Sequence, residues 1–268
     1  MASVNGLWIG TRLSPLERAC IQSFLSRGHE FNLYVYEAVA DVPAGCLLRD
    51  AATILPAARI FAHAGGLSKG SFGAFSDLFR YQMLFEHGGW WVDLDVFCLA
   101  DILPETGVVI GRQDAQQING AVMRFPRGHE LMGIALAECA GQSAEVGWGE
   151  IGPDLLTRLI AAGNLPDAIF PEAAFYPVHC FHFWTMLDPR RTAYVAEKIR
   201  GSACVHLWNE MLRRIHFDKH ILPPDGSLLR NLYEWTIGTD EFVQEYVLAP
   251  ACPQDSLQLQ IVQRQADT

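Results

Sequence analysis

FSDLFRYQMLFEHGGWWVDLDV, residues 75–96, predicts a helix that turns directly into a strand. The helical part begins near Ala74, where Ser76 is a plausible N-cap. Gly88 and Gly89 are expected to end the helix through a left-handed residue. The residues from 90 to 97 are rich in aromatic and β-branched side chains, a composition typical of a strand.

The predicted strand contains a pair of carboxylates, Asp93 and Asp95. Successive side chains of a strand point to opposite faces, so we expect both acids on one face and Val92, Leu94 and Val96 on the other. Two hard oxygen ligands on one face suit Mg²⁺ or Mn²⁺, whose other positions are filled by substrate phosphate and water. Fifteen aspartates in 268 residues give about 0.8 such pairs by chance. The spacing alone therefore predicts little, and a strand that ends in solvent would look the same.

The helix before this pair has a polar face. Asp77, Arg80 and Tyr81 are three and four residues apart and share one side, whereas Leu78 and Phe79 lie on the packed side. Only two glycines separate this face from the carboxylate pair. An acid and a guanidinium so placed can hydrogen-bond sugar hydroxyls, which need both donors and acceptors. An ordinary surface ion pair is the alternative.

The N-terminal residues indicate an α/β domain. Residues 7–9 form an apolar run, and Ser14, Pro15 and Glu17 supply an N-cap, a proline at the first helical position and a capping-box acid. An apolar stripe continues to Gly28, and residues 31–36 alternate as a strand does. This order predicts strand, helix, strand. Further strands are expected at 107–111, 121–125 and 203–207, and further helices at 130–140, 153–162, 192–198 and 227–235.

The length and the net charge of the chain limit the classes of protein to which it can belong. A chain of 268 residues with 50% hydrophobic and 19% charged residues can bury a sizeable core. We expect one main domain over residues 1–240 and a loosely ordered C-terminal extension over 241–268. The formal net charge of −10 and the pI near 5.3 argue against a sequence-independent grip on nucleic acid or anionic lipid.

We see no stretch of sequence that is typical of a targeting signal. The first ten residues lack the basic start and apolar stretch of a secretory signal, and no run of eighteen apolar residues occurs. The seven cysteines are scattered without a C-x-x-C pair, which is typical of reduced thiols. We expect a cytoplasmic protein with no integral membrane segment, and peripheral association at the inner membrane face stays open.

The whole run from Phe75 to Val96 resembles the DXD sugar-binding region of glycosyltransferase family 32 and its relatives, the α-1,4-glycosyltransferases and the glucosylating clostridial toxins. Their pattern is approximately S-D-x-x-R-Y-x-x-L-x-x-x-G-G-x-Y-x-D-x-D. This sequence meets every named position except one, because Trp91 stands where tyrosine is usual. The fixed register of helix face, glycine pair and carboxylates makes the resemblance specific.

Three further segments are similar to the same family. Trp8 stands in a W-x-G element whose tryptophan stacks on uracil in the family, although a core tryptophan would look alike. Asn119 is similar to an asparagine that lies near the donor sugar there. His206, Trp208 and Asn209 match the H-x-W-N element of the α-1,4 branch. We expect His206 and Trp208 on one face of a strand, with the imidazole a fair ligand for manganese or a satisfied core histidine.

The resemblance implies a GT-A type, Rossmann-like α/β fold with a mixed central sheet flanked by helices. It implies an enzyme that moves a hexosyl or N-acetylhexosaminyl unit from a UDP-sugar to a glycan, glycolipid or protein acceptor, with Mn²⁺ or Mg²⁺ and with retention. The implied residues are Asp77, Arg80, Asp93 and Asp95 for catalysis, Trp8, Asp77, Arg80, Tyr81, Asp93, Asn119, Trp208 and Asn209 for donor binding, and Asp93, Asp95 and His206 for the metal.

Other functions are also compatible with the same residues. A metal-dependent phosphatase or nucleotidyltransferase also uses paired acids, but usually adds further carboxylates or a threonine where Phe97 stands. A nucleotide-sugar or carbohydrate-binding protein without turnover would keep the motif. His179 and His182 lack the spacing of a zinc site. Residues 65–73 lack the Walker spacing and are expected to form a mobile loop over the site, with Lys69 as a phosphate contact.

Overall fold

The computed structural model describes residues 1–163, 165, 169–250, 252–253 and 256–264. Its strands are β1 (Ser3–Trp8), β2 (Glu30–Val35), β3 (Leu47–Asp50), β4 (Gly89–Val92), β5 (Val96–Cys98), β6 (Val109–Arg112), β7 (Ile118–Phe125), β8 (Ile169–Phe170), β9 (Cys204–His206), β10 (Gln244–Leu248) and β11 (Leu259–Gln263). Its α-helices are α1 (Pro15–Ser26), α2 (Gly73–His87), α3 (Glu130–Glu138), α4 (Pro153–Gly163), α5 (Glu172–Phe175), α6 (Thr192–Lys198), α7 (Asn209–Arg214) and α8 (Leu228–Thr236).

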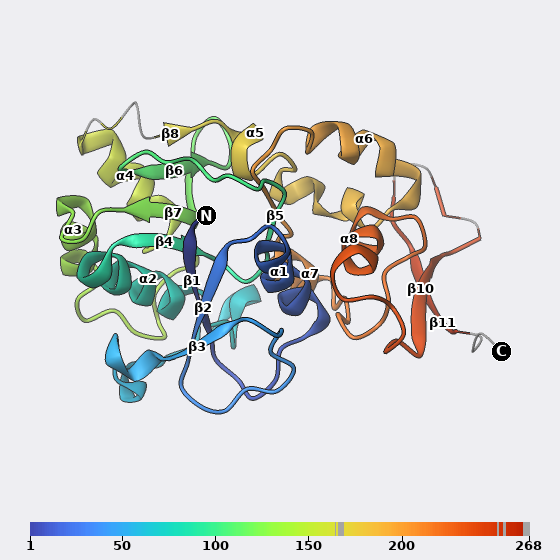
Figure 1. The fold of residues 1–268 in the computed structure, drawn as a ribbon, viewed down its shortest axis with the longest axis horizontal. Helices are drawn as coiled ribbons and strands as arrows, with labels where there is room; N and C mark the ends of the chain where they lie inside the picture. The colour runs from blue at the N-terminus through green and yellow to red at the C-terminus, as the bar shows by residue number, and fades with distance from the viewer. Residues whose placement is uncertain (164, 166–168, 251, 254–255, 265–268) are drawn as a thin grey trace.

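A mixed sheet forms the centre of the fold. Among the described residues, seven strands pair in the order β3-β2-β1-β4-β7-β6-β8. The strands from β3 to β4 are parallel, and β7 runs antiparallel to both β4 and β6. Helices α2, α3 and α4 gather beside β4 and β7, while α1 and α8 lie on the other side (Figure 1). The predicted α/β fold with a mixed sheet flanked by helices is therefore confirmed.

The core consists of two apolar clusters on opposite faces of this sheet. Neighbouring residues of β4 alternate between them, with Trp90 and Val92 in the cluster that contains α1 and Trp91 in the cluster that contains α2. This alternation is the normal consequence of strand geometry. Because both faces of β4 are buried, the strand is fixed firmly at the point where it delivers the carboxylate pair.

The predicted opening of strand, helix and strand is confirmed. Ser14, Pro15 and Glu17 start α1 with the expected capping box. The first strand is longer than the predicted 7–9 and begins at Ser3, which pairs in parallel register with Glu30. Its polar Asn5 still fits the sheet because the side-chain amide donates to the carbonyl of Trp90, at 2.7 Å.

Helix α2 begins earlier than predicted. Its first residue is Gly73 and its N-cap is Phe72, so the assignment of Ser76 as the N-cap is wrong. Ser76 lies in the first turn, where its carbonyl and its hydroxyl each accept from the Arg80 guanidinium at 3.3 Å. Ser76, which the sequence pattern predicts as the N-cap, instead holds the Arg80 side chain in place.

The predicted strand over residues 90–97 is broken in the middle. β4 ends at Val92, Asp93 to Asp95 form a turn closed by the Val96 N–H on the Asp93 carbonyl at 3.0 Å, and β5 then pairs with β9 in a separate sheet. The expectation that both acids leave one face of a continuous strand is therefore wrong. A turn, rather than strand alternation, brings the two carboxylates to one place.

The C-terminal region contains an antiparallel pair. β10 and β11 pair from Gln244↔Gln263 to Leu248↔Leu259 and lie at the end of the molecule opposite α3 (Figure 1). Residues 259–263, predicted to be loosely ordered, thus form a strand, whereas residues 251, 254–255 and 265–268 of that extension lie outside the described residues. The division at residue 240 stays a prediction. Among the described residues, no helix combines the length and apolarity needed to cross a bilayer.

Gly88 and Gly89 allow a direct comparison of two glycine substitutions. Both have positive φ, +67° and +90°, but only at Gly88 would a Cβ lie 2.5 Å from a backbone atom, the nitrogen of Arg127. Gly88→Ala should lower the free energy of unfolding by about 3 kcal/mol or more, because steric overlap adds to backbone strain. Gly89→Ala should cost about 1–2 kcal/mol, since a Cβ there would only make an ordinary contact with the Asn5 side chain at 4.0 Å. Urea denaturation measures both, and equal losses would contradict this account.

Candidate active site

The carboxylate pair lies at the carboxyl end of two parallel strands. β1 ends at Trp8 and the neighbouring β4 ends at Val92, so Trp8 and the Asp93–Asp95 turn lie at the same edge of the sheet. Ligands of α/β sheets bind at this edge. The Asp93 N–H is still held by the sheet through the Ala121 carbonyl of β7, at 2.8 Å.

Pairing of β5 with β9 brings a histidine to the turn. Val96 faces His206 in the register, and His206 Nε2 lies 3.1 Å from Asp95 Oδ2. The same oxygen accepts from the backbone N–H of Asn209 at 2.8 Å, at the start of α7. Ligand atoms of Asp93, Asp95 and His206 all lie within 4.8 Å of one another. Residues more than 100 apart in the chain thus converge on one cluster.

The helix α2 adds a buried arginine to this cluster. Arg80 Nη1 lies 3.3 Å from Asp77 Oδ1, and Nη2 lies 3.0 Å from Asp93 Oδ1. Trp91 Nε1 donates to the same Asp93 oxygen at 2.8 Å, and its ring lies under the guanidinium at 5.4 Å. Charge-assisted bonds of this kind fix geometry as well as charge. We call Asp77, Arg80, Asp93, Asp95 and His206 the DXD site.

Burial and neighbouring charge act differently on the three acids. Burial raises the pKa of Asp77 to about 6, although Arg80 opposes the shift. Burial likewise raises the pKa of Asp93 despite Arg80. Burial also acts to raise the pKa of Asp95, but His206 and the Asn209 N–H outweigh it and hold that pKa below its usual value. The DXD site contains three carboxylates and one guanidinium, so the acids, when ionised, leave a net negative charge suited to a cation.

The pKa of Asp77 predicts a cost in stability above pH 6. The folded state binds more protons at Asp77 than the unfolded state between about pH 4 and pH 6, so stability falls as pH rises through that window. Asp77→Asn should therefore raise the free energy of unfolding at pH 7.5 by roughly 1–3 kcal/mol, and the gain should vanish near pH 4. Urea denaturation in the presence of a chelator measures this, and a loss of stability at pH 7.5 would contradict it.

The cluster fits a divalent cation. Carboxylate oxygens with an imidazole are a donor set that Mn²⁺ accepts. His206 Nε2 faces Asp95, while its buried Nδ1 has no hydrogen-bond partner among the described residues. A satisfied core histidine would use both ring nitrogens. The imidazole is therefore not explained by core packing alone.

Two predicted donor contacts are already engaged within the protein. Tyr81 is fully buried, and its hydroxyl donates to the Ile151 carbonyl at 2.8 Å. Asn119 is also buried; its amide donates to Gln113 Oε1 at 2.7 Å and accepts from the Ala121 N–H at 2.8 Å. In this arrangement both residues position neighbouring backbone, and their contact with a donor stays a prediction.

Trp8 is half-buried at the end of β1, and its Nε1 has no hydrogen-bond partner within the part of the chain that the structure describes. The prediction that Trp208 shares a strand face with His206 is wrong, because β9 ends at His206 and Trp208 has a left-handed φ of 55°. Its ring still packs 4.1 Å from that of His206, and Nε1 donates to the Val178 carbonyl at 2.8 Å. Trp208 therefore fixes the imidazole, and its backbone places the Asn209 N–H on Asp95.

Sequence reasoning did not single out Tyr176. Its hydroxyl donates to the Asn119 carbonyl at 3.2 Å and accepts from the Val122 N–H at 3.0 Å. Its ring packs edge-on against His206 at 5.8 Å. No motif surrounds Tyr176, so only the fold reveals that it supports the site. The close approach of Gly152 to Asp77 was not predicted either; a Cβ on Gly152 would lie 2.7 Å from the Asp77 carboxylate.

The other candidate segments have structural partners. The loop with Gly66 and Lys69 is tied to α7, because Arg213 donates to the Leu67 and Lys69 carbonyls at 2.6 and 3.3 Å. A phosphate contact by Lys69 stays a prediction. His179 accepts from the Phe181 N–H at 3.2 Å as a helix N-cap. That role explains the histidine without a metal.

The fold and the DXD site fit the predicted resemblance, and comparison with known proteins identifies two matching regions. Residues 20–115 match the glycosyltransferase sugar-binding region containing the DXD motif, and residues 124–234 match the α-1,4-glycosyltransferase conserved region. The chain thus contains two regions that match glycosyltransferase family models, and the predicted resemblance is confirmed.

Two curated relatives and one solved structure are similar to this chain. The lactosylceramide 4-alpha-galactosyltransferases of Mus musculus and Homo sapiens are each 25% identical over 154 residues, which cover 53% of this chain and 43% of each relative. The match thus spans less than half the length of these relatives. The solved structure named PaToxG Glycosyltransferase aligns over 88% of this chain and 85% of its own, with a TM-score of 0.43 and 11% identity.

Proposed function

We propose that this protein transfers a hexosyl or N-acetylhexosaminyl unit from a UDP-sugar to a glycan, glycolipid or protein acceptor, with Mn²⁺ or Mg²⁺ and with retention of configuration. The observation that carries the proposal is the continuous chain of contacts from Asp77 through Arg80 to Asp93, next to the Asp95–His206 pair. It joins polar groups suited to a sugar with groups suited to a metal diphosphate. UDP-galactose is the first donor to test, because the named relatives are galactosyltransferases.

Each residue has a distinct part in the proposed reaction. Asp95 and His206 would hold the cation, which supplies stabilisation of negative charge on the departing diphosphate. Trp8 stacks on the uracil base from the end of the neighbouring strand. Asp77 accepts from sugar hydroxyls and Arg80 donates to them, while Asp93 contacts the ribose or the metal.

The transfer itself needs positioning more than a protein nucleophile. The acceptor oxygen bonds to the anomeric carbon as the bond from that carbon to the diphosphate oxygen breaks. UDP leaves with the electron pair and takes up the proton of the acceptor hydroxyl. Attack on the same face that UDP leaves gives retention.

Hydrolysis of nucleotide sugars without an acceptor tests the proposal. UDP-glucose, UDP-galactose and UDP-N-acetylglucosamine are incubated with the protein and Mn²⁺, and in parallel with a chelator. We expect at least one donor to be hydrolysed with Mn²⁺ and none with the chelator. If no donor is bound or turned over, the transferase proposal fails. Hydrolysis of a simple phosphate ester without preference for UDP-sugars would favour a phosphatase.

A further inference from the structure

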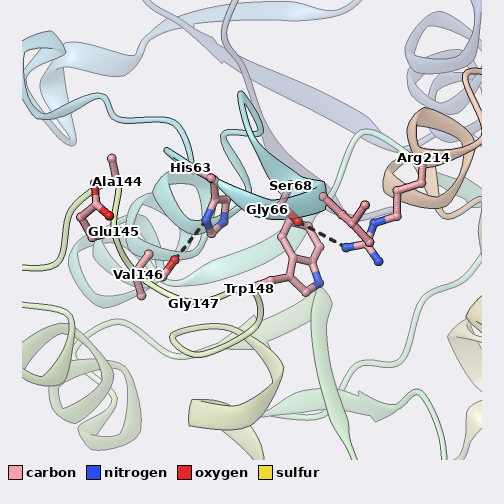
Figure 2. Close-up of a pocket in the computed structure, with 11 residues that line it drawn as sticks. His63, Gly66, Ser68, Ala144, Glu145, Val146, Gly147, Trp148 and Arg214 are labelled. Atoms are coloured by element: carbon pink, nitrogen blue, oxygen red, sulfur yellow. Dashed lines mark hydrogen bonds between the residues drawn. The ribbon is translucent and has the colours of Figure 1, made fainter.

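The surface of the protein has a hollow outside the DXD site. It is a cavity of about 450 Å³ between residues 63–68 and residues 144–148, and Arg214 at the end of α7 completes its wall (Figure 2). Its volume falls within the roughly 300–1,000 Å³ that is usual for small-molecule sites. None of its lining residues belongs to the DXD site.

Helix α2 connects this cavity to the sugar-binding acid. A Cβ on Gly73, the first residue of α2, would lie 3.1 Å from the Trp148 ring. Asp77 follows about one helical turn later. The loop that carries Trp148 also reaches Gly152, where a Cβ would lie 2.7 Å from the Asp77 carboxylate.

Helix α7 makes a second connection, on the metal side. It begins at Asn209, whose backbone N–H is bonded to Asp95, and it ends at Arg214 in the cavity wall. With six residues, α7 spans only about 9 Å. A molecule in the cavity therefore lies within reach of the reacting end of a donor sugar.

Trp148 presents a broad aromatic face that is held in place. Its exposed fraction is 49%, yet Arg214 lies 5.3 Å from its ring centroid and the His63 ring 5.5 Å away (Figure 2). Arg214 is fixed in turn by Glu210 at 2.9 Å and by the Ser68 hydroxyl at 3.3 Å. A tryptophan that is both rigid and exposed is typical of a binding surface.

The polar groups around Trp148 are mixed in character. Ser68, Glu145 and Arg214 offer a hydroxyl, a carboxylate and a guanidinium, and three glycines expose backbone groups. Arg214 is paired with Glu210, which also pairs with Arg213, and the nearby carboxylate of Glu145 disfavours a phosphate in the cavity. A hexose has an apolar face of C–H groups and a rim of hydroxyls that both donate and accept, which matches this lining.

We propose that the cavity binds a hexose ring of the acceptor, stacked on Trp148, so that the acceptor at this site is a saccharide rather than a protein side chain. This assignment rests on the proposed transferase function and deepens it. Free oligosaccharides and lipid-linked ones share the same ring chemistry, and the test distinguishes them.

The test uses the full chain with Mn²⁺ and whichever UDP-sugar it hydrolyses. The acceptor probes are lactose, N-acetyllactosamine, cellobiose and maltose, each as the free sugar and as its octyl glycoside. We expect transfer to at least one probe. Trp148→Ala should raise the KM for that probe at least tenfold and lower the ratio of transfer to hydrolysis to a similar extent. Trp148→Phe, which keeps an aromatic face, should restore most of the affinity. A preference for octyl glycosides would indicate a lipid-linked acceptor.

Trp235→Ala is the matched control. Trp235 is 48% exposed and Arg27 lies 5.0 Å from its ring, but it lies on α8, outside the cavity. This variant should keep the wild-type KM for the probe. An unchanged KM in Trp148→Ala would overturn the assignment. Donor hydrolysis by a wild-type protein that neither binds nor glycosylates any probe would overturn it too, while leaving the proposed function intact. A lack of donor hydrolysis would defeat the proposed function itself, and the inference with it.

Discussion

Asp95→Ala should lower metal-dependent turnover of the UDP-sugar by about 10³-fold or more. One carboxylate oxygen of Asp95 lies 3.1 Å from His206 Nε2 and accepts a hydrogen bond from the Asn209 N–H at 2.8 Å. Its loss removes a cation ligand and leaves His206 without its charged partner. Steady-state hydrolysis of the donor over a range of Mn²⁺ concentrations measures the effect, and excess Mn²⁺ should not restore the rate.

Two further variants separate chemistry from folding in this experiment. Asp95→Asn keeps the shape and a hydrogen-bond acceptor for Asn209 but weakens cation binding, so it should fold and remain nearly inactive. Asp101→Ala removes a surface acid paired with Arg27 and should behave as wild type. Substantial Mn²⁺-dependent activity in a folded Asp95→Asn protein would show that the metal binds elsewhere.

Asp77→Ala should reduce kcat/KM for the UDP-sugar by about 10²-fold while changing the affinity for free UDP less than threefold. Asp77 is linked to the metal cluster through Arg80 and Asp93, and it lies on α2 rather than on the turn. We expect it to contact the sugar and not the nucleotide. Titration calorimetry with UDP and with the intact UDP-sugar measures the two affinities.

Glu197→Ala provides the matched control for Asp77. Glu197 and Arg200 also form an i,i+3 pair, with N–O distance 2.7 Å, but both side chains are exposed. A surface pair of this kind contributes little, so this variant should keep wild-type kinetics and stability. If Asp77→Ala behaved like Glu197→Ala, the Asp77–Arg80 pair would be an ordinary ion pair. Equal loss of UDP in the Asp77 and Asp95 variants would contradict the division of roles.

Local sequence patterns predicted the parts of the fold that depend on neighbouring residues. The capping box at Ser14 and Glu17 and the glycine pair at the end of α2 act within a few residues, and both were predicted correctly. The helix face with Asp77 and Arg80 also follows from helical spacing alone. These elements depend on residues that are close together in the sequence, so they can be predicted from the sequence alone.

The N-cap of α2 was misplaced locally, but the errors at the DXD site arise where distant residues decide the structure. Val92 and Val96 look like one strand, but β4 pairs with β7 while β5 pairs with β9, and the chain must turn between the two sheets. The same pairing puts His206 on Asp95, which no spacing in the sequence could show. Tyr176 and the contact of Gly152 with Asp77 were missed for a similar reason, since the partners of these residues lie 30 or more residues away along the chain.

The location of the cation tests the central claim most directly. Crystals of the protein grown with UDP and Mn²⁺ should show an anomalous manganese peak bonded to Asp95 and His206, with the diphosphate on its other side. Asp77 and Arg80 should face the space that the sugar of an intact donor would fill. Bound UDP with manganese placed away from Asp95 and His206, or with no manganese at all, would contradict the account.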